Sequence, residues 1–455
     1  MDWTEKRFLV FGTGISGIAA ATLLKKKKCS VVLYDTNPGL DRDKVRAQSP
    51  LLEEVPILLG ELLEREMDEI DIAVLSPGVP TDLPVVDKMR EKKIAVWGEI
   101  ELGYVFGKGK VLAITGTNGK TTTTTLLGEI LKAACEDVKV VGNIGIPYTS
   151  VAAETTDQTA TAAEISSFQL ETIHSFCPQV SAILNITPDH LNRHHTMENY
   201  RKAKLDITKN QGPEQTCVLN YEDQVLREFG KMIPARVVWF SSRRKLPEGL
   251  YLEGDEIRYA CRGVESLVCD VKDLKIIGRH NYENVMAAAA MALSFGISLD
   301  IIHEVLIRFR AVEHRIEYVT EKRGIRFYND SKGTNPDAAI QAIRAMQWPT
   351  LLIGGGYDKG SEYDTWIQAF DGKVKKLVLL GATREKIADT AAALGFPQKD
   401  ILFADSLLEA VDMCYANAEK GDAVLLSPAC ASWGMFKNYE ERGDMFKEIV
   451  RELEE

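Results

Sequence analysis

The chain has 455 residues, which is too long for one ordinary hydrophobic core and predicts two or three domains. Its 55 lysines and arginines against 66 aspartates and glutamates give a formal net charge of −11, which argues against a nucleic acid as the main partner. The first residues lack the apolar region of a signal peptide, and the eight cysteines include no C-x-x-C pair, so we expect a reduced cytoplasmic protein without structural zinc or disulfides.

The N-terminal part, residues 1–98, alternates strands and helices. We expect strands at 7–11, 30–34 and 72–75 and a helix at 17–26. This alternation favours parallel strands joined by crossover helices, so it predicts a Rossmann-like α/β domain.

A glycine-rich turn, Gly12-Thr13-Gly14-Ile15-Ser16-Gly17, follows the first of these strands and opens the helix. With Asp35 at the end of the next strand, the pattern is typical of a dinucleotide site in which Asp35 contacts a ribose hydroxyl. The physical argument requires only a diphosphate or a similar anion at the helix N-terminus. A tight turn that binds nothing and eases helix packing is the alternative interpretation.

The middle part, residues 99–311, opens with an apolar strand that begins at Val111 and runs into Thr115-Gly116-Thr117-Asn118-Gly119-Lys120-Thr121-Thr122. A strand, a glycine loop and a helix in this order are what a phosphate-binding loop requires, because backbone N–H groups surround the phosphates. Lys120 would bring charge to the outer phosphates, and the Thr121 hydroxyl is a ligand for Mg²⁺. Ile114 replaces the first glycine of the usual pattern, and a glycine turn with a solvated Lys120 is the alternative.

The rest of the middle part predicts a central P-loop ATPase-like domain. We expect further strands at 138–141, 159–165, 180–186, 216–220 and 237–240, a small antiparallel insert at 243–273, and helices at 281–295 and 299–309. The most apolar helix is too short to span a bilayer, so no membrane contact is expected.

Three segments of this part contain candidate site residues. Glu164 ends a strand near the P-loop, where Mg²⁺ is often held, although glutamate is also common at strand ends. The run Asp189–His195 carries three histidines but a poor zinc ligand set, so we place His190 near phosphate and Mg²⁺ and expect His194 and His195 to be loop residues. Lys204 lies on a helix, where the local sequence predicts a solvated side chain.

The third part, residues 312–455, again predicts a Rossmann-like α/β sheet. We expect strands at 325–329, 350–353, 376–380 and 423–426, followed in three cases by polar loops at 329–336, 354–359 and 427–433. Because the carboxyl ends of parallel strands meet at one edge, these loops predict a ligand site there.

Taken together, these motifs resemble the Mur ligases, the amide ligases of peptidoglycan precursor synthesis, and most closely the branch that adds D-glutamate. The resemblance covers the whole chain. It is carried by Gly116-Thr117-Asn118-Gly119-Lys120-Thr121, Gly142-Asn143-Ile144-Gly145, Glu164-Ile165-Ser166-Ser167-Phe168-Gln169, Asp189-His190-Leu191, Gly278-Arg279-His280-Asn281-Tyr282-Glu283-Asn284, Glu313-His314-Arg315, Asn329-Asp330-Ser331-Lys332 and Ser427-Pro428-Ala429-Cys430-Ala431-Ser432.

The resemblance implies a UDP-substrate domain at 1–98, an ATP domain at 99–311 and an amino-acid domain at 312–455, and it reassigns the first glycine motif to a uridine nucleotide. It implies that the UDP-substrate is bound by Gly14, Ser16, Gly17, Asp35, Thr36, Ser76, Gly78, Asn143 and His190. ATP would be bound by Gly116, Thr117, Asn118, Gly119, Lys120, Thr121, Thr122, Asn281, Asn284, Arg315 and Asp330. The amino acid would be bound by Thr334, Lys359, Ser432 and Tyr439.

The implied reaction is ATP-dependent ligation of D-glutamate to UDP-N-acetylmuramoyl-L-alanine through an acyl phosphate. The resemblance implies catalytic roles for Lys120, Glu164, His190 and Lys204 and Mg²⁺ contacts for Thr121, Glu164, His190 and Lys204, with Lys204 carrying a carbamate. A cytoplasmic monomer is expected. Asn37 stands where family members often have arginine, and Asn192 where they often have aspartate.

Several alternatives stay open on the sequence alone. Folylpolyglutamate synthases share the chemistry but lack the domain that precedes the P-loop here. The ligase adding the third peptide residue usually carries an Asp-Asn-Pro-Arg run, which is absent from this sequence. An NAD-dependent oxidoreductase would explain the first glycine motif and not the P-loop, and a non-catalytic P-loop switch protein would need no amino-acid substrate.

Overall fold

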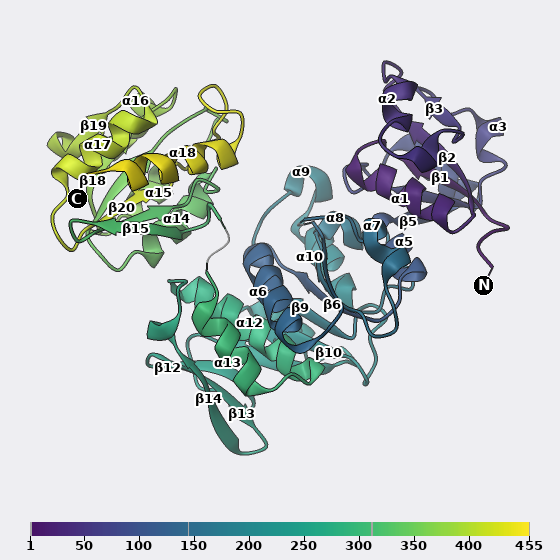
Figure 1. Ribbon diagram of the computed structural model, residues 1–455, viewed down its shortest axis with the longest axis horizontal. Coiled ribbons are helices and arrows are strands. Elements are labelled where there is room, and N and C mark those ends of the chain that lie inside the picture. The colour runs from purple at the N-terminus through teal and green to yellow at the C-terminus, as the bar shows by residue number, and fades with distance from the viewer. Residues whose placement is uncertain (1, 144, 311–312, 455) are drawn as a thin grey trace. The chain divides into compact units, whose positions relative to one another are not determined.

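The computed structural model describes residues 2–143, 145–310 and 313–454 (Figure 1). Within these residues the strands form three sheets with flanking helices, which confirms the expected α/β class. The chain divides into two compact units, Met1–Cys269 with Glu283–Leu306, and Asp270–Tyr282 with Ile307–Glu455. The expected domain boundary at residues 311 and 312 lies outside the described residues, as does Ile144 of the Gly142–Gly145 motif.

The N-terminal sheet is parallel, with the strand order β3-β2-β1-β4-β5. Its strands are β1 (Arg7–Phe11), β2 (Ser30–Asp35), β3 (Ile57–Leu59), β4 (Ile72–Leu75) and β5 (Ala95–Gly98). The helices are α1 (Ile15–Lys26), α2 (Arg42–Arg46), α3 (Glu64–Met67), α4 (Pro84–Glu91) and α5 (Glu99–Phe106).

Both faces of this sheet are buried, because successive side chains of a strand point to opposite faces. Phe8 and Val10 of β1 pack in one cluster with α1 and α5, while Leu9 and Phe11 pack in another with α3 and α4. The first cluster continues into the middle sheet through buried residues such as Val111. The N-terminal and middle sheets of this unit therefore share one hydrophobic core.

The middle sheet has the strand order β14-β13-β12-β11-β10-β9-β6-β8-β7. Its strands are β6 (Lys110–Thr115), β7 (Val138–Gly142), β8 (Ala160–Glu164), β9 (Val180–Ile183), β10 (Thr216–Asn220), β11 (Arg236–Ser241), β12 (Gly249–Glu253), β13 (Glu256–Cys261) and β14 (Val264–Asp270). The helices of this part are α6 (Lys120–Ala134), α7 (Tyr148–Val151), α8 (Ser167–Leu170), α9 (Leu191–His194), α10 (Met197–Leu205), α11 (Gln224–Phe229), α12 (Arg279–Phe295) and α13 (Leu299–Arg308).

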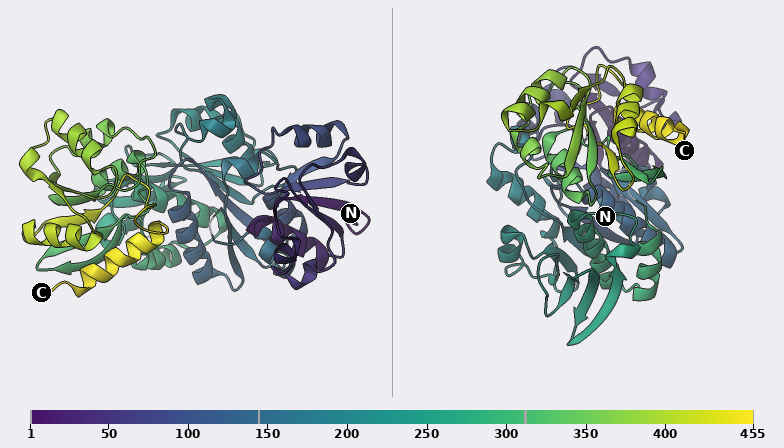
Figure 2. Two further views of the ribbon diagram at one scale, coloured as in Figure 1. Left: turned by 90° about the horizontal axis from the view of Figure 1, so that it is seen from above. Right: turned by 90° about the vertical axis from the view of Figure 1, so that its left-hand side faces the viewer.

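The expected antiparallel insert is present as an extension of this sheet. β12 pairs with β11 in parallel and with β13 in antiparallel fashion. β13 and β14 project away from the remainder of the middle sheet (Figures 1 and 2). The P-loop strand β6 instead lies between β9 and β8, with both neighbours parallel to it, so its carboxyl end is surrounded by other strand ends.

The C-terminal sheet has the order β15-β16-β20-β17-β18-β19 and is parallel except for the β15–β16 hairpin. Its strands are β15 (Glu317–Lys322), β16 (Ile325–Asn329), β17 (Thr350–Gly354), β18 (Val374–Leu379), β19 (Ile401–Phe403) and β20 (Ala423–Leu426). Its helices are α14 (Pro336–Ala345), α15 (Asp364–Gln368), α16 (Arg384–Ala393), α17 (Leu407–Asn417) and α18 (Tyr439–Glu452). Helices cover both faces, with α14 to α16 in one cluster and α17 and α18 in the other (Figure 2).

In the part of the chain that the structure describes, none of the helices combines the length and the apolar character that crossing a bilayer requires.

Candidate active site

The P-loop joins β6 to α6, and its glycines have conformations that other residues rarely adopt. Gly116 has φ 149° and Gly119 has φ 87°. A Cβ atom on Gly119 would lie 2.2 Å from the side-chain oxygen of Asn284, so a side chain has no room there. The loop is held from outside by Asn185, whose side-chain oxygen accepts from the Asn118 amide at 2.8 Å.

Lys120 begins α6 and folds back over the loop. Its ammonium group donates to the carbonyl oxygens of Gly116 and Thr117, both at 2.9 Å. The positive charge is thereby placed over the same loop whose backbone N–H groups suit an anion.

Lys204 also reaches the P-loop, from α10. Its side chain is only 2% exposed, and its Nζ donates to the Gly116 carbonyl at 2.7 Å. Burial, with a further contribution from the charge of Lys120, lowers the pKa of Lys204 to about 6. The expectation of a solvated helix lysine is therefore wrong, because Tyr200, Ala203 and Lys204 form the buried face of α10.

We expect the unmodified Lys204 amine to make protein stability depend on pH. Between about pH 6 and pH 10.5 the unfolded chain binds a proton at this amine that the folded chain does not, so the free energy of unfolding rises with pH across this window. One such group contributes a slope of up to about 1.4 kcal/mol per pH unit. Lys204→Met should remove this slope, whereas Lys202→Met, on the exposed face of α10, should retain it. Urea unfolding in CO₂-free buffer across this pH range measures the difference, and an unchanged slope in Lys204→Met would contradict the expectation.

Glu164 ends β8, beside the P-loop strand, and is 1% exposed. One carboxylate oxygen accepts from the Asn143 amide nitrogen at 2.7 Å. The other oxygen is buried and has no hydrogen-bond partner among the described residues, as expected of an oxygen that binds a cation. The described residues contain no group of three or more His, Cys, Asp or Glu side chains that would hold a metal without help. The unpartnered Glu164 oxygen therefore fits a Mg²⁺ ion that also takes phosphate oxygens as ligands.

The histidine loop contains two exposed histidines, His190 and His195, and one buried histidine, His194. His190 has φ 51° and a side chain that is 51% exposed, with its ring 5.1 Å from that of Phe168. His194 is 4% exposed and ends α9, so the expectation that it is a loop residue is wrong. Burial lowers the pKa of His194. His195 follows α9 with its Nε2 3.0 Å from a carboxylate oxygen of Asp82, and the side chain of Asn192 is outside what the structure describes.

The first glycine loop is tightly packed. A Cβ atom on Gly17 would lie 1.8 Å from the Gly12 carbonyl oxygen, so glycine is required where α1 meets the loop. Asp35 accepts from the backbone N–H and the hydroxyl of Thr13, at 3.1 and 2.9 Å, and from the Asn37 amide at 3.0 Å. In this structure Asp35 thus shapes the glycine loop.

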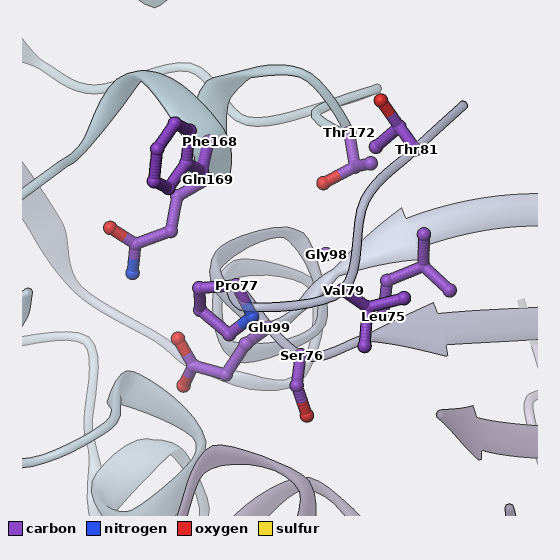
Figure 3. A pocket seen from close by; sticks show the side chains of 10 residues that line it. All are labelled: Leu75, Ser76, Pro77, Val79, Thr81, Gly98, Glu99, Phe168, Gln169 and Thr172. Atoms are coloured by element: carbon purple, nitrogen blue, oxygen red, sulfur yellow. The ribbon is translucent and has the colours of Figure 1, made fainter. Parts of the chain in front are cut away.

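A pocket of about 220 Å³ lies between the loop after β4 and helix α8 (Figure 3). It is lined by Leu75, Ser76, Pro77, Val79, Thr81, Gly98, Glu99, Phe168, Gln169 and Thr172. The Ser76 hydroxyl is buried and has no hydrogen-bond partner within the described part of the chain. This pocket brings a predicted substrate residue next to the segment that follows Glu164.

In the C-terminal unit, the predicted residues gather at the carboxyl ends of β16, β17 and β20. Asp330 accepts from the Ser427 hydroxyl at 2.7 Å and from the Ile316 amide at 3.2 Å, and burial raises its pKa to about 7. Thr334 adjoins Lys332 through a 2.9 Å backbone hydrogen bond, and the Lys332 ammonium lies 5.4 Å from the Tyr439 ring.

The loops after β17 and β20 are joined directly. The Tyr357 amide donates to the Ala431 carbonyl at 2.9 Å, and the Tyr357 and Trp433 rings meet edge to face at 5.7 Å. Lys359 is exposed and places its ammonium 4.6 Å from the Trp433 ring, next to buried Ser432. Lys359 thus lies beside the loop that carries Ser432.

One feature of this unit, Arg442, was not found from the sequence. Arg442 is 2% exposed and donates to the Ser331 hydroxyl, the Ser331 carbonyl and the Cys430 carbonyl, so it ties two of the polar loops together. Arg442 lies on the buried face of α18 together with a second charged residue, Lys447.

Arg315, which the resemblance placed at ATP, has a buried Nε without a hydrogen-bond partner among the residues described, which suits a guanidinium that meets an anion.

The two asparagines expected at adenine have different surroundings. Asn281 donates to the Ile277 carbonyl at 2.8 Å. The Asn284 side-chain oxygen accepts from the Thr123 hydroxyl at 3.3 Å, directly behind the P-loop.

The three parts of the chain match three domains of one enzyme family. Residues 6–98 match the Mur ligase MurD-like N-terminal domain, residues 114–292 the Mur ligase middle domain, and residues 314–430 the Mur ligase glutamate ligase domain.

Relatives of known name match over the full length. The UDP-N-acetylmuramoylalanine–D-glutamate ligase of Lachnoclostridium phytofermentans is 57% identical over 455 residues, with 100% of both chains covered. Those of Lachnospira eligens and Thermoanaerobacter pseudethanolicus are 55% and 48% identical, again with 100% of both chains covered.

Solved structures share the fold at low identity. The UDP-N-acetylmuramate–alanine ligase MurC of Thermotoga maritima has a TM-score of 0.59 and 20% identity, covering 98% of this chain and 99% of that one. A pseudomurein peptide ligase type C of Methanothermus fervidus has a TM-score of 0.59 and 19% identity, covering 99% and 100%. The domain matches and the full-length relatives show that the chain belongs to the Mur ligases, the family of ATP-dependent ligases that form amide bonds.

Proposed function

We propose that this protein joins D-glutamate to UDP-N-acetylmuramoyl-L-alanine at the expense of ATP, a step of peptidoglycan precursor synthesis. The observation that carries the choice of substrates is the identity of 57% over the full length to a relative named for this reaction. The P-loop with its two converging lysines supports the nucleotide chemistry. The match of residues 6–98 to a Mur ligase N-terminal domain argues against a folylpolyglutamate synthase, which lacks this domain, and against an oxidoreductase.

The reaction proceeds in two chemical steps. The alanine carboxylate attacks the γ-phosphorus of ATP, ADP leaves, and an acyl phosphate forms. The amine of D-glutamate then attacks the acyl carbon, loses a proton and displaces inorganic phosphate. Lys120 would place its charge on the β- and γ-phosphates. A Mg²⁺ ion held by Thr121 and Glu164, with His190 and Lys204 nearby, would neutralise charge on the phosphoryl oxygens.

The burial of the Lys204 amine supports the proposed carbamate. An amine with a pKa near 6 is mostly neutral at neutral pH, so its nitrogen can attack CO₂ and release a proton to give a carbamate. The product carries a negative charge and two oxygens beside the P-loop, where a second Mg²⁺ needs anionic ligands. Carbamylation would also place a negative charge opposite the Lys120 ammonium, which shares the Gly116 carbonyl with Lys204.

The remaining site residues are assigned by the same family logic. The UDP-substrate would lie on the glycine loop of the domain at 1–98 and on Ser76, and D-glutamate on Lys359, Ser432, Thr334 and Tyr439 of the domain at 312–455. A cytoplasmic monomer is proposed.

The direct test measures phosphate release. Purified protein with ATP, Mg²⁺ and UDP-N-acetylmuramoyl-L-alanine should release phosphate only when D-glutamate is added, and the product should contain one glutamyl residue by mass spectrometry. Equal release with another amino acid, or release without any, would contradict the proposal. NADH fluorescence titration should show no binding.

We expect D-glutamate to be preferred over D-aspartate because Lys359 sits at a fixed position on the Trp433 ring. The shorter side chain would not reach that exposed cation and would lose its charge-assisted hydrogen bond, at a cost of about 1.5–3 kcal/mol, which appears as a lower kcat/KM. Lys359→Met should raise the KM for D-glutamate, while the control Lys437→Met, at an 88% exposed position, should not. Equal kcat/KM for the two amino acids would rule out the Lys359 contact.

A further inference from the structure

Four side chains connect the loop after β4 to the histidine loop. We call Thr81, Glu171, Arg193 and His194 the Glu171 knot. Glu171 caps the C-terminus of α8, close to the segment that carries Glu164. Its two carboxylate oxygens are shared among the other three side chains.

The contacts of Glu171 are short and shielded. One carboxylate oxygen accepts from the Thr81 hydroxyl and from the Arg193 guanidinium, both at 3.0 Å. The other lies 3.2 Å from Nδ1 of His194. The side chains of Glu171, Arg193 and His194 are 16%, 13% and 3% exposed, so water competes weakly for these hydrogen bonds.

Both ring nitrogens of His194 have polar neighbours. Nδ1 lies 3.2 Å from a Glu171 carboxylate oxygen, and Nε2 lies 2.9 Å from the Ser167 hydroxyl, a contact that a neutral imidazole can make. Burial lowers the pKa of His194, which agrees with this neutral form. The imidazole therefore joins α8 to α9 without adding a buried cation.

Arg193 completes the connection to the loop after β4. The same guanidinium nitrogen that contacts Glu171 donates to the Val79 carbonyl at 3.1 Å. The guanidinium also lies 5.1 Å from the Phe168 ring, which the rings of His190 and His194 approach at 5.1 and 5.4 Å. Val79 and Thr81 line the same pocket as Ser76 and Phe168 (Figure 3).

We propose that Glu171 is a positioning residue that couples the loop after β4, residues 76–82, to the histidine loop, residues 189–195. Glu171 is not among the predicted substrate-binding residues; it acts by holding Thr81 on one side and Arg193 and His194 on the other. The assignment of substrates to the two loops rests on the proposed function. The coupling itself is a property of the contacts and is testable without turnover.

The first experiment compares kinetic constants of Glu171→Gln with the wild-type enzyme. The amide keeps the shape but lacks the charge and one acceptor, so the KM for UDP-N-acetylmuramoyl-L-alanine should rise by about tenfold while the KM for ATP stays within about twofold. The control Glu228→Gln changes a glutamate that is 63% exposed and should leave all constants unchanged. A folded Glu171→Gln enzyme with an unchanged KM for the sugar nucleotide would overturn the proposal.

A double-mutant cycle separates coupling from general destabilisation. Thr81→Val should raise the same KM in the wild-type background and have little further effect in the Glu171→Gln background, because both changes break one connection. Additive effects would overturn the proposal. If Glu171→Gln does not fold, Thr81→Val tests the proposal by itself. An unchanged KM for UDP-N-acetylmuramoyl-L-alanine in Thr81→Val would then overturn the proposal.

Amide hydrogen exchange of the protein without substrates tests the coupling independently of activity. In Glu171→Gln, exchange should accelerate in both 76–82 and 189–195 and remain unchanged in the C-terminal unit. Acceleration in 189–195 only would overturn the coupling. If the wild-type enzyme releases no phosphate, the proposed function fails, and the exchange result still decides whether the knot holds both loops.

Discussion

Lys120→Ala is expected to lower kcat by about 10²-fold or more while the fold is retained, because the variant loses the cation that meets charge developing on the transferred phosphoryl group. In the structure the Lys120 ammonium folds over the carbonyls of Gly116 and Thr117, at the point where the backbone N–H groups of the P-loop would receive the phosphates. The measurement is steady-state phosphate release at saturating substrates, with circular dichroism to check folding.

Lys132→Ala is the matched control for this change. Lys132 lies on the same helix, α6, and pairs at its surface with Glu129, so its removal should leave kcat within about twofold of wild type. Near-wild-type turnover of Lys120→Ala would refute the P-loop assignment.

Lys204→Ala is expected to remove most of the ligase activity, by about 10²-fold or more, because a metal site beside the phosphates loses an anionic ligand. Small carboxylates such as acetate should restore part of the activity by placing an oxygen ligand in the space that the side chain leaves. The rescue should increase with acetate concentration and be absent from Lys120→Ala, which lacks a cation and not a ligand. Wild-type activity should fall in CO₂-free buffer and recover when bicarbonate is added.

A second readout does not depend on turnover. Wild-type protein in ¹³C-bicarbonate should show a carbamate carbon signal by NMR that is missing from Lys204→Ala and unchanged in Lys202→Ala, whose lysine is on the exposed face of α10. A fully active Lys204→Ala enzyme, or a wild-type protein without the carbamate signal, would refute this role of Lys204.

Most of the fold was predictable because its signals are local. The β1 range was predicted to the residue, and the order of strand, glycine loop and helix located both glycine-rich turns. Strands of three residues, such as β3 and β19, were missed, since so short a run carries little periodicity. β15 was missed because it is an edge strand with a mixed burial pattern and a polar sequence.

The residues of the candidate site also differ in whether a local signal identifies them. Glu164 was identified as a site candidate because it ends a strand near the P-loop, which is a local feature. Local reasoning placed Lys204 in solvent and His194 in a loop, and both side chains are buried. Their burial depends on partners far along the chain, and Lys204 meets Gly116 across 88 residues. Only the family resemblance pointed to Lys204.

The three α/β parts, the P-loop and the polar loops at strand ends were predictable from sequence, because each depends on residues that are close together along the chain. The tertiary structure decided which side chains lose contact with water and which segments meet. It buried Lys204 against the P-loop, brought Arg442 to Ser331 across 111 residues and Glu171 to Thr81 across 90. Burial and hydrogen bonding depend on residues that only the folded chain brings together. The lowered pKa of Lys204, about 6, and the contacts of the Glu171 knot therefore cannot be predicted from the local sequence.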